Sequence, residues 1–263
     1  MGLPQDPGFF RAAIFLAVLG VLALLEVLLR GPNPAPRRAR RWPANAGLVL
    51  LDTLLARLLL PAGAVSAALW AQAHGFGLFN LLAWPTWLEF TLALLLLDLA
   101  IYWQHRLLHA LPWLWPLHRV HHTDATLDAT SALRFHPLEI LLSLVFKVAL
   151  AVLLGIAPLA ILAFEILLSS FALVTHANLA LPPRLDRALR WLLVTPAMHR
   201  VHHSTHVEEQ HRNFGFHLSV WDRMFGSYAA QSRETPQTFG VAGVDDVDAT
   251  RFTSLLREPF VRR

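Results

Sequence analysis

The chain has 263 residues, of which 55% are hydrophobic and only 15% are charged, whereas about 25% are charged in an ordinary soluble protein. It contains no cysteine, which excludes disulfides, iron–sulfur clusters, thiolate metal sites and cysteine nucleophiles. The net charge is +4, and because the chain is so hydrophobic we expect its basic residues to face anionic lipid head groups rather than nucleic acid.

The chain begins with a predicted membrane helix over residues 9–29, an apolar run of the roughly 20 residues that a bilayer requires. Positive charge follows this run instead of preceding it, which favours a retained transmembrane helix over a cleaved signal peptide. The positive-inside tendency then places the following arginine-rich loop in the cytoplasm. The arginines of this loop are Arg30, Arg37, Arg38, Arg40 and Arg41.

Two further spans are predicted before the first histidines. The second covers residues 46–70, with a kink at Pro61. It contains Asp52 and Arg57, which either pair with each other or lie near the interface. Residues 71–86 form an outer turn, and the third span, residues 87–103, leads directly to His105. Counting these crossings places His105 and the rest of the chain on the cytoplasmic side.

Three histidine clusters are the strongest functional signal. HRLLH occupies residues 105–109, and the pentapeptide HRVHH occurs twice, at 118–122 and 199–203. Residues three and four apart share a helix face, so each cluster can present its imidazoles together. Each imidazole offers one nitrogen to a metal and the other to a hydrogen bond, and eight of them suit two ions of iron, zinc, copper or nickel. The predicted ligands are His105, His109, His118, His121, His122, His199, His202 and His203.

The remaining elements follow from hydropathy. Residues 138–174 are apolar but broken at Gly155 and Pro158, which predicts a helical hairpin in the membrane. Lys147 and Glu165 lie in its two halves and either form an interhelical pair or snorkel to the interface. Residues 184–193 are amphipathic, as in a helix lying on the membrane or on an ordinary protein surface. Residues 231–263 are expected to be an irregular tail, after an N-terminal membrane region (1–87) and a catalytic region (88–230).

The three clusters resemble the histidine boxes of the fatty acid hydroxylase/sterol desaturase superfamily. RFHPLE (134–139), HANL (176–179), NFG (213–215) and WDRMFG (221–226) are similar to landmarks of its bacterial, alkylglycerol monooxygenase-like members. The resemblance covers about residues 90–228. It implies an all-α, polytopic membrane enzyme whose histidine-rich helical cap holds two iron ions, with zinc as a substitute. Such enzymes use O2 to hydroxylate or desaturate lipid chains or sterols.

The resemblance also suggests further site residues. His176 matches a ninth histidine of related hydroxylases, although Ala180 stands where many of them have another. His136, in the RFHP landmark, is the candidate for a tenth ligand. Asn178, Asn213 and Asp222 are candidates for orienting imidazoles, with capping or turn formation as the alternative for each. His74 is expected to be incidental, and His206, His211 and His217 lie near the third box but off its spacing.

An unactivated C–H bond requires a metal–oxygen oxidant, and the chain has neither an HExxH zinc-peptidase motif nor a GxGxxG nucleotide motif. Electrons must therefore come from a separate ferredoxin, cytochrome or reductase. Such an acidic carrier could dock on the basic residues Arg106, Arg119, Arg200 and Arg212, unless these are simply solvated. The favoured function is an inner-membrane lipid oxygenase with no nucleic-acid partner. A histidine-rich metal transporter and a non-catalytic protein stapled by metal are the alternatives.

Overall fold

A computed structural model describes residues 3–29, 31–33, 38–82, 85–234, 237–245 and 247–261, and its regular structure there is helical. Within these ranges the β structure amounts to two isolated bridges, Leu193 with Leu218 and Ser204 with Phe239. The long helices are α1 (Pro7–Leu29), α2 (Arg38–Leu59), α3 (Gly63–Ala73), α4 (Thr86–Ala110), α6 (Pro137–Leu154) and α7 (Pro158–His176). The shorter helices are α5 (Trp115–His122), α8 (Pro183–Leu189), α9 (Pro196–His202), α10 (Val207–Gln210), α11 (Val220–Met224) and α12 (Phe252–Arg257). The predicted all-α fold is confirmed.

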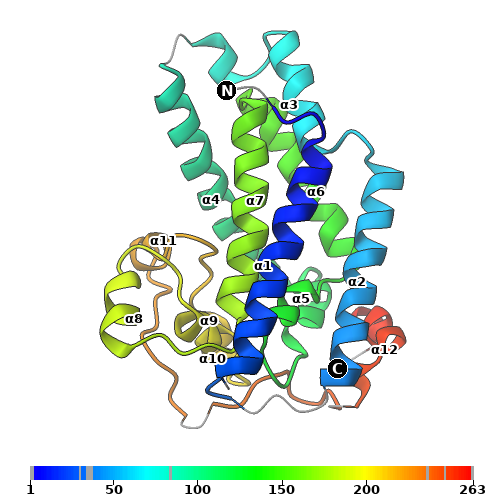
Figure 1. Ribbon diagram of the computed structural model, residues 1–263, viewed down its shortest axis with the longest axis vertical. Coiled ribbons are helices and arrows are strands. Elements are labelled where there is room, and N and C mark those ends of the chain that lie inside the picture. The colour runs from blue at the N-terminus through cyan, green and yellow to red at the C-terminus, as the bar shows by residue number, and fades with distance from the viewer. Residues whose placement is uncertain are drawn as a thin grey trace.

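Within the described ranges, five helical segments are long and apolar enough to cross a membrane: α1, the stretch from α2 to residue 81, α4, α6 and α7. They run along the long axis of the molecule, and α8, α9, α10 and α12 gather at the end opposite the N-terminus (Figure 1). Their outer side chains are apolar and exposed, as with Leu16 (62%) and Leu50 (70%). Exposed leucines on long helices are what contact with lipid requires.

The second span differs in detail from the prediction. Helix α2 begins at Arg38, so Arg38, Arg40 and Arg41 lie in its first turn rather than in a loop; Arg30 and Arg37 lie outside the described residues. The helix ends at Leu59 and α3 starts at Gly63, so the predicted kink at Pro61 is a complete break in the helix. The possible pair between Asp52 and Arg57 does not form, because Asp52 is buried on one face of α2 and Arg57 is exposed on another.

Arg41 is buried in an ion network instead of facing head groups. Its guanidinium donates two hydrogen bonds of 2.7 Å to Asp124 and one of 2.8 Å to Asp128, in the loop after α5. Arg134 lies 3.5 Å from the same Asp124 carboxylate. Burial alone would raise the pKa of Asp124, but Arg134 and Arg41 outweigh it and hold that pKa at about 2. The expectation that Arg41 faces lipid head groups was wrong, because the carboxylates that pair with it are distant in the sequence. The network holds residues 123–134 against α2.

The predicted hairpin of α6 and α7 is confirmed. Helix α6 is capped at its C-terminal end by Gly155, whose positive φ of 66° suits a residue without Cβ, and Pro158 begins α7. Lys147 Nζ lies 3.1 Å from Glu165 Oε1, so these residues form the interhelical pair rather than snorkelling. Arg11 of α1 pairs with the same carboxylate, which joins α1 to the hairpin.

The C-terminal tail is more ordered than expected. Helix α12 places Leu255 in a buried cluster with Ala44 and Leu48 of α2 and Val120 of α5. This apolar contact orders a segment whose own sequence signal is weak. The amphipathic stretch after residue 183 forms only the short helix α8, whose residues are all at least partly exposed; its attachment to the membrane stays a prediction.

Candidate metal centre

Four helices carry the box histidines and His176 to one place. His105 and His109 lie in the last two turns of α4, and α7 ends at His176. The two HRVHH pentapeptides lie on short helices opened by proline, α5 and α9, where Pro116 and Pro196 occupy the first turn and fix the start of the helix. All nine imidazoles are at most 5% exposed.

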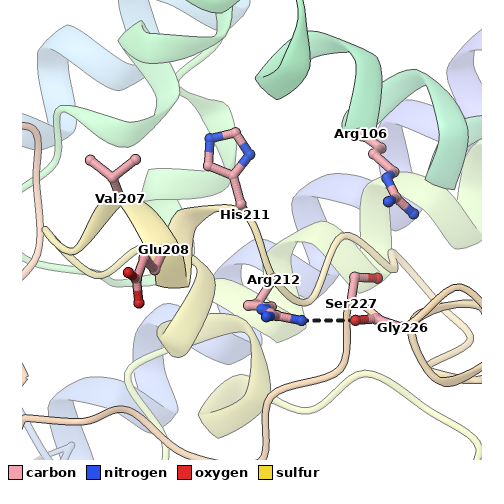
Figure 2. A pocket seen from close by; sticks show the side chains of 7 residues that line it. All are labelled: Arg106, Val207, Glu208, His211, Arg212, Gly226 and Ser227. Atoms are coloured by element: carbon pink, nitrogen blue, oxygen red, sulfur yellow. Dashed lines mark hydrogen bonds between the residues drawn. The ribbon is translucent and has the colours of Figure 1, made fainter.

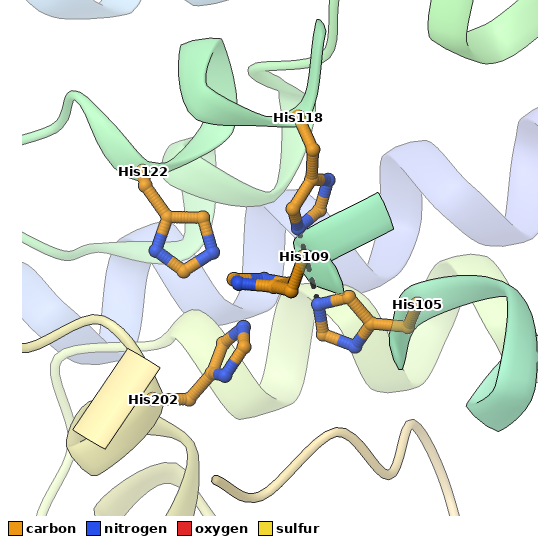
Figure 3. A group of neighbouring side chains, drawn as sticks. All are labelled: His105, His109, His118, His122 and His202. Carbon is orange, nitrogen blue, oxygen red and sulfur yellow. Dashed lines mark hydrogen bonds between the residues drawn. The ribbon is translucent and has the colours of Figure 1, made fainter. Parts of the chain in front are cut away.

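The structure divides these nine histidines into two adjoining clusters. Each cluster offers one ligand atom per residue, all within 4.8 Å of one another. The first, drawn in Figure 3, consists of His105, His109, His118, His122 and His202. The second consists of His121, His176, His199 and His203. The clusters touch where the His122 and His203 rings stack with centroids 4.4 Å apart.

Each HRVHH pentapeptide serves both clusters. In each pentapeptide the first and last histidines, four residues apart, belong to one cluster and the histidine between them belongs to the other. His118 and His122 lie in the first cluster and His121 in the second. His199 and His203 lie in the second cluster and His202 in the first. At about 100° per residue, positions i and i+4 are about 40° apart on a helix, whereas i+3 and i+4 differ by about 100°. The expectation that all three imidazoles of a box point the same way is therefore replaced by a split of two and one.

The ring nitrogens in the second cluster are too close together to be satisfied by hydrogen bonds among themselves. His176 Nε2 lies 3.1 Å from the Nε2 atoms of both His121 and His203, and 3.2 Å from that of His199. Each neutral imidazole has a single N–H, so four converging Nε2 atoms leave lone pairs facing one another. Metal–nitrogen bonds of about 2.0–2.1 Å around one ion would place ligand atoms at about this spacing. In the first cluster, His105 and His118 approach in the same way, at 3.1 Å.

The outward nitrogens are held by the fold. Nδ1 of His105 donates to the carbonyl of Phe214 at 2.8 Å, and Nδ1 of His202 donates to that of Arg212 at 2.7 Å. Nδ1 of His176 likewise donates to Ala172 at 2.7 Å. A proton fixed on Nδ1 leaves Nε2 as an unprotonated ligand atom directed into the cluster.

Burial favours the neutral form of several of these imidazoles. Burial lowers the pKa of His122 and His203 well below 6.5, and each is lowered further by neighbouring imidazoles. Burial lowers the pKa of His202 to about 3. Among the described residues, both ring nitrogens of His109 and His122 are buried without a hydrogen-bond partner. Buried orphan nitrogens are costly, and a bound cation would relieve that cost. The donor set therefore fits metal ions.

Glu139 is a site residue that sequence reasoning missed. It lies in the first turn of α6 and its Oε1 accepts a 2.7 Å hydrogen bond from Nδ1 of His118. Its position in the RFHPLE landmark was the available signal, but only the packing of α6 against α5 shows that this carboxylate faces an imidazole.

The three candidates for orienting imidazoles are placed differently. Asp222 accepts from the backbone N–H groups of Phe214 and Gly215 at 2.8 and 2.9 Å, and so holds the segment whose Phe214 carbonyl binds His105. Asn213, at a positive φ of 55°, donates to the carbonyls of Met198 and Ala229, both at 2.9 Å. Asn178 bonds instead to Asn33 and lies outside both clusters.

Several histidines stay outside the clusters. His136 caps α6 by accepting from Leu138 N, and His74 is exposed beside Trp70. His206 pairs with Glu234, and His217 pairs with Asp98 at 2.5 Å. His211 also lies outside both clusters, although its ring centroid is 5.8 Å from that of His109.

The four arginines of the expected docking face divide into two pairs. Arg119 and Arg200 are buried; Arg119 lies 3.1 Å from Glu258, and Arg200 faces backbone carbonyls after α7. The basic face is therefore smaller than expected, because these two guanidinium groups tie the cap together. Arg106 and Arg212 line a pocket at the surface (Figure 2).

Residues 90–227, just over half of the chain, match the family model described as fatty acid hydroxylase. The chain belongs to this family. It is 31% identical over 185 residues to the ornithine lipid hydroxylase OlsE of Rhizobium tropici, covering 68% of this chain and 53% of that protein. It is also 31% identical over 235 residues to human alkylglycerol monooxygenase, covering 88% of this chain and 50% of that protein.

A match to rat cholesterol 25-hydroxylase is 28% identical over 137 residues and covers 52% of this chain and 45% of that protein. The chain thus spans about half the length of these curated relatives. No solved structure matches it. Membership of this family confirms the resemblance drawn from the three histidine boxes. The same chain is a helical membrane protein with two buried histidine clusters.

Proposed function

We propose that this protein is an O2-dependent di-iron membrane enzyme that hydroxylates, or desaturates, a lipid. The observation that carries the proposal is the pair of adjoining imidazole clusters, five and four strong, at one end of a bundle of apolar helices. The relatives named for ornithine lipid, alkylglycerol and cholesterol support a lipid or sterol-like substrate.

The nine clustered histidines would hold the two ions, with zinc as a substitute in a protein loaded outside the cell. Bound iron supplies the one-electron and O2 chemistry that an unactivated C–H bond requires. The protein's own part is to keep the ligands neutral, dry and oriented. Burial does the first two, while backbone carbonyls and Glu139 fix the Nδ1 protons of His105, His118, His176 and His202.

We further propose an integral inner-membrane location with the clusters on the cytoplasmic side. Helix α2 begins with Arg38 and Arg40 at the same end of the bundle as the short helices of the cap (Figure 1). The positive-inside tendency supports a cytoplasmic location for that end. A soluble ferredoxin, cytochrome or reductase would have access to the clusters from this side and would supply the electrons.

The test is metal content together with lipid oxidation. Purified protein should contain about two iron ions per chain, and a strain expressing it should form an O2-dependent, oxidised lipid that a deletion strain lacks. His109→Ala should abolish the product and reduce bound iron, because His109 offers a ligand atom to the first cluster and both of its ring nitrogens are buried without a hydrogen-bond partner. His74→Ala, at an exposed histidine far from the clusters, is the matched control and should change neither.

Fewer than about one metal ion per folded chain would contradict the proposal. Metal flux into proteoliposomes without O2 consumption would favour a transporter instead. If His109→Ala lowered only protein abundance and left lipid oxidation unchanged, the metals would have a structural role alone.

A further inference from the structure

A pair of adjoining pockets lies on the cap beside the first histidine cluster. The larger has a volume of about 620 Å³ and is lined by residues that include Arg106, Arg212 and His211. The smaller, of about 170 Å³, is lined by residues that include His109, Trp115 and again His211. The two pockets share the lining residues Val207 and His211, so they are neighbours between the arginines and an imidazole of the first cluster.

Two guanidinium groups and one carboxylate line the larger pocket. The carboxylate, Glu208, pairs with Arg233, so the lining keeps a net positive charge. Figure 2 shows Arg106, from α4, and Arg212, from the segment after α10, on two sides of it. Within the described part of the chain neither guanidinium has an ion-pair partner: Arg212 donates to the Gly226 carbonyl at 2.8 Å, and the contacts of Arg106 with Tyr102 and Phe225 are long, at 3.3 and 3.4 Å. Two unpaired guanidinium groups at one concavity are suited to a small multivalent anion.

The pocket lies at the boundary between the apolar surface and the polar cap. Trp103 and Leu107, on the same stretch of α4 as Arg106, are 40% and 46% exposed. The Arg106 guanidinium lies over the Trp103 ring, 5.2 Å from its centroid. A tryptophan and an arginine at the end of a membrane helix mark the level of the lipid head groups. The anion that reaches this pocket most directly is therefore part of a lipid.

The pocket is also coupled to the first cluster. Arg106 follows His105 in α4, and the backbone carbonyl of Arg212 accepts the hydrogen bond that orients His202. An anion bound by both side chains would thus lie close to two ligand residues of that cluster. The lipid carbons nearest to it would be the ones able to enter the smaller pocket beside His109.

We propose that the Arg106–Arg212 pocket binds the phosphate of a lipid head group, which positions the substrate for oxidation at a carbon near that head group. This inference rests on the proposed function for the oxidation, but the binding site stands on its own geometry. A lipid head group is favoured over a carrier protein because the exposed Trp103 and Leu107 beside Arg106 place this pocket at the level of the head groups.

Binding is tested on the metal-loaded, full-length protein in detergent, with calorimetry as the readout. The probes are dihexanoyl phosphatidate, dihexanoylglycerol, which lacks the phosphate, and inorganic phosphate. We expect the phosphatidate to bind most tightly. Arg106→Gln and Arg212→Gln should each weaken its binding about tenfold or more, as for loss of a charge-assisted hydrogen bond, and leave dihexanoylglycerol unaffected. Arg187→Gln, at an exposed arginine of α8, is the matched control.

Arg106→Lys and Arg212→Lys keep the charge and should retain part of the affinity for phosphatidate. If a glutamine variant does not fold, the matching lysine variant provides the test of binding. Unchanged phosphatidate binding in folded variants would overturn the proposal, as would inorganic phosphate binding as tightly as the lipid. Variants that lose affinity only for an acidic [2Fe–2S] ferredoxin would assign the surface to the electron carrier instead. Intact phosphatidate binding without lipid oxidation would refute the proposed function and leave this site standing.

Discussion

Glu139 provides the sharpest test of how the clusters are held. Its Oε1 accepts a 2.7 Å hydrogen bond from His118 Nδ1, and both side chains are nearly inaccessible, at 3% and 1% exposed. A buried, charge-assisted bond of this kind contributes about 1.5–3 kcal/mol, and loss of such a partner costs about 10–100-fold in metal affinity. Glu139→Gln keeps a neutral acceptor, whereas Glu139→Ala removes it. We therefore expect a graded loss of iron affinity, smaller for glutamine and larger for alanine.

The assay is competition for iron against a chelator of known affinity, followed by metal analysis of the folded protein. Glu89→Gln, at the opposite end of α4 from the clusters, is the control and should bind iron as the wild type does. Thermal unfolding of the metal-free proteins separates a loss of metal affinity from a loss of fold. Iron affinity within twofold of wild type in Glu139→Ala would show that this carboxylate does not support the site.

Two further predictions concern stability. Asp124→Asn leaves the buried Arg41 without its bidentate partner and should lower the free energy of unfolding by about 3 kcal/mol in thermal melts. The pKa of Asp124 in the folded protein, about 2, lies below the ordinary 3.8. Its contribution to the free energy of unfolding should therefore be complete above about pH 4 and lost as the pH falls towards 2. Asp124→Asn should lack this pH-dependent contribution. Gly155→Ala should lower the free energy of unfolding by about 2 kcal/mol, because Gly155 has a left-handed backbone and an added Cβ would lie 2.6 Å from the Asn80 side chain. The control, Gly20→Ala, should change stability little, because there is open space around Gly20. Equal melting temperatures for the two variants would contradict this prediction.

Local patterns in the sequence were sufficient for much of the fold. Length and hydropathy located the membrane helices, and the break of the apolar stretch at Gly155 and Pro158 located the hairpin. The spacing of the boxes placed the histidines on helices and predicted enough imidazoles for two ions. These features could be predicted because each depends on residues within one or two helical turns of one another.

Tertiary structure decided which groups meet. It assigned His121 and His202 to the clusters opposite their own box partners, brought Glu139 to His118, and buried Arg41 against Asp124. It also left His136 outside both clusters, as the cap of α6. Spacing along a helix fixes only the angle between side chains on that helix. Whether a given face meets a ligand, a counter-ion or lipid depends on how the helices pack, through contacts between residues far apart in the chain.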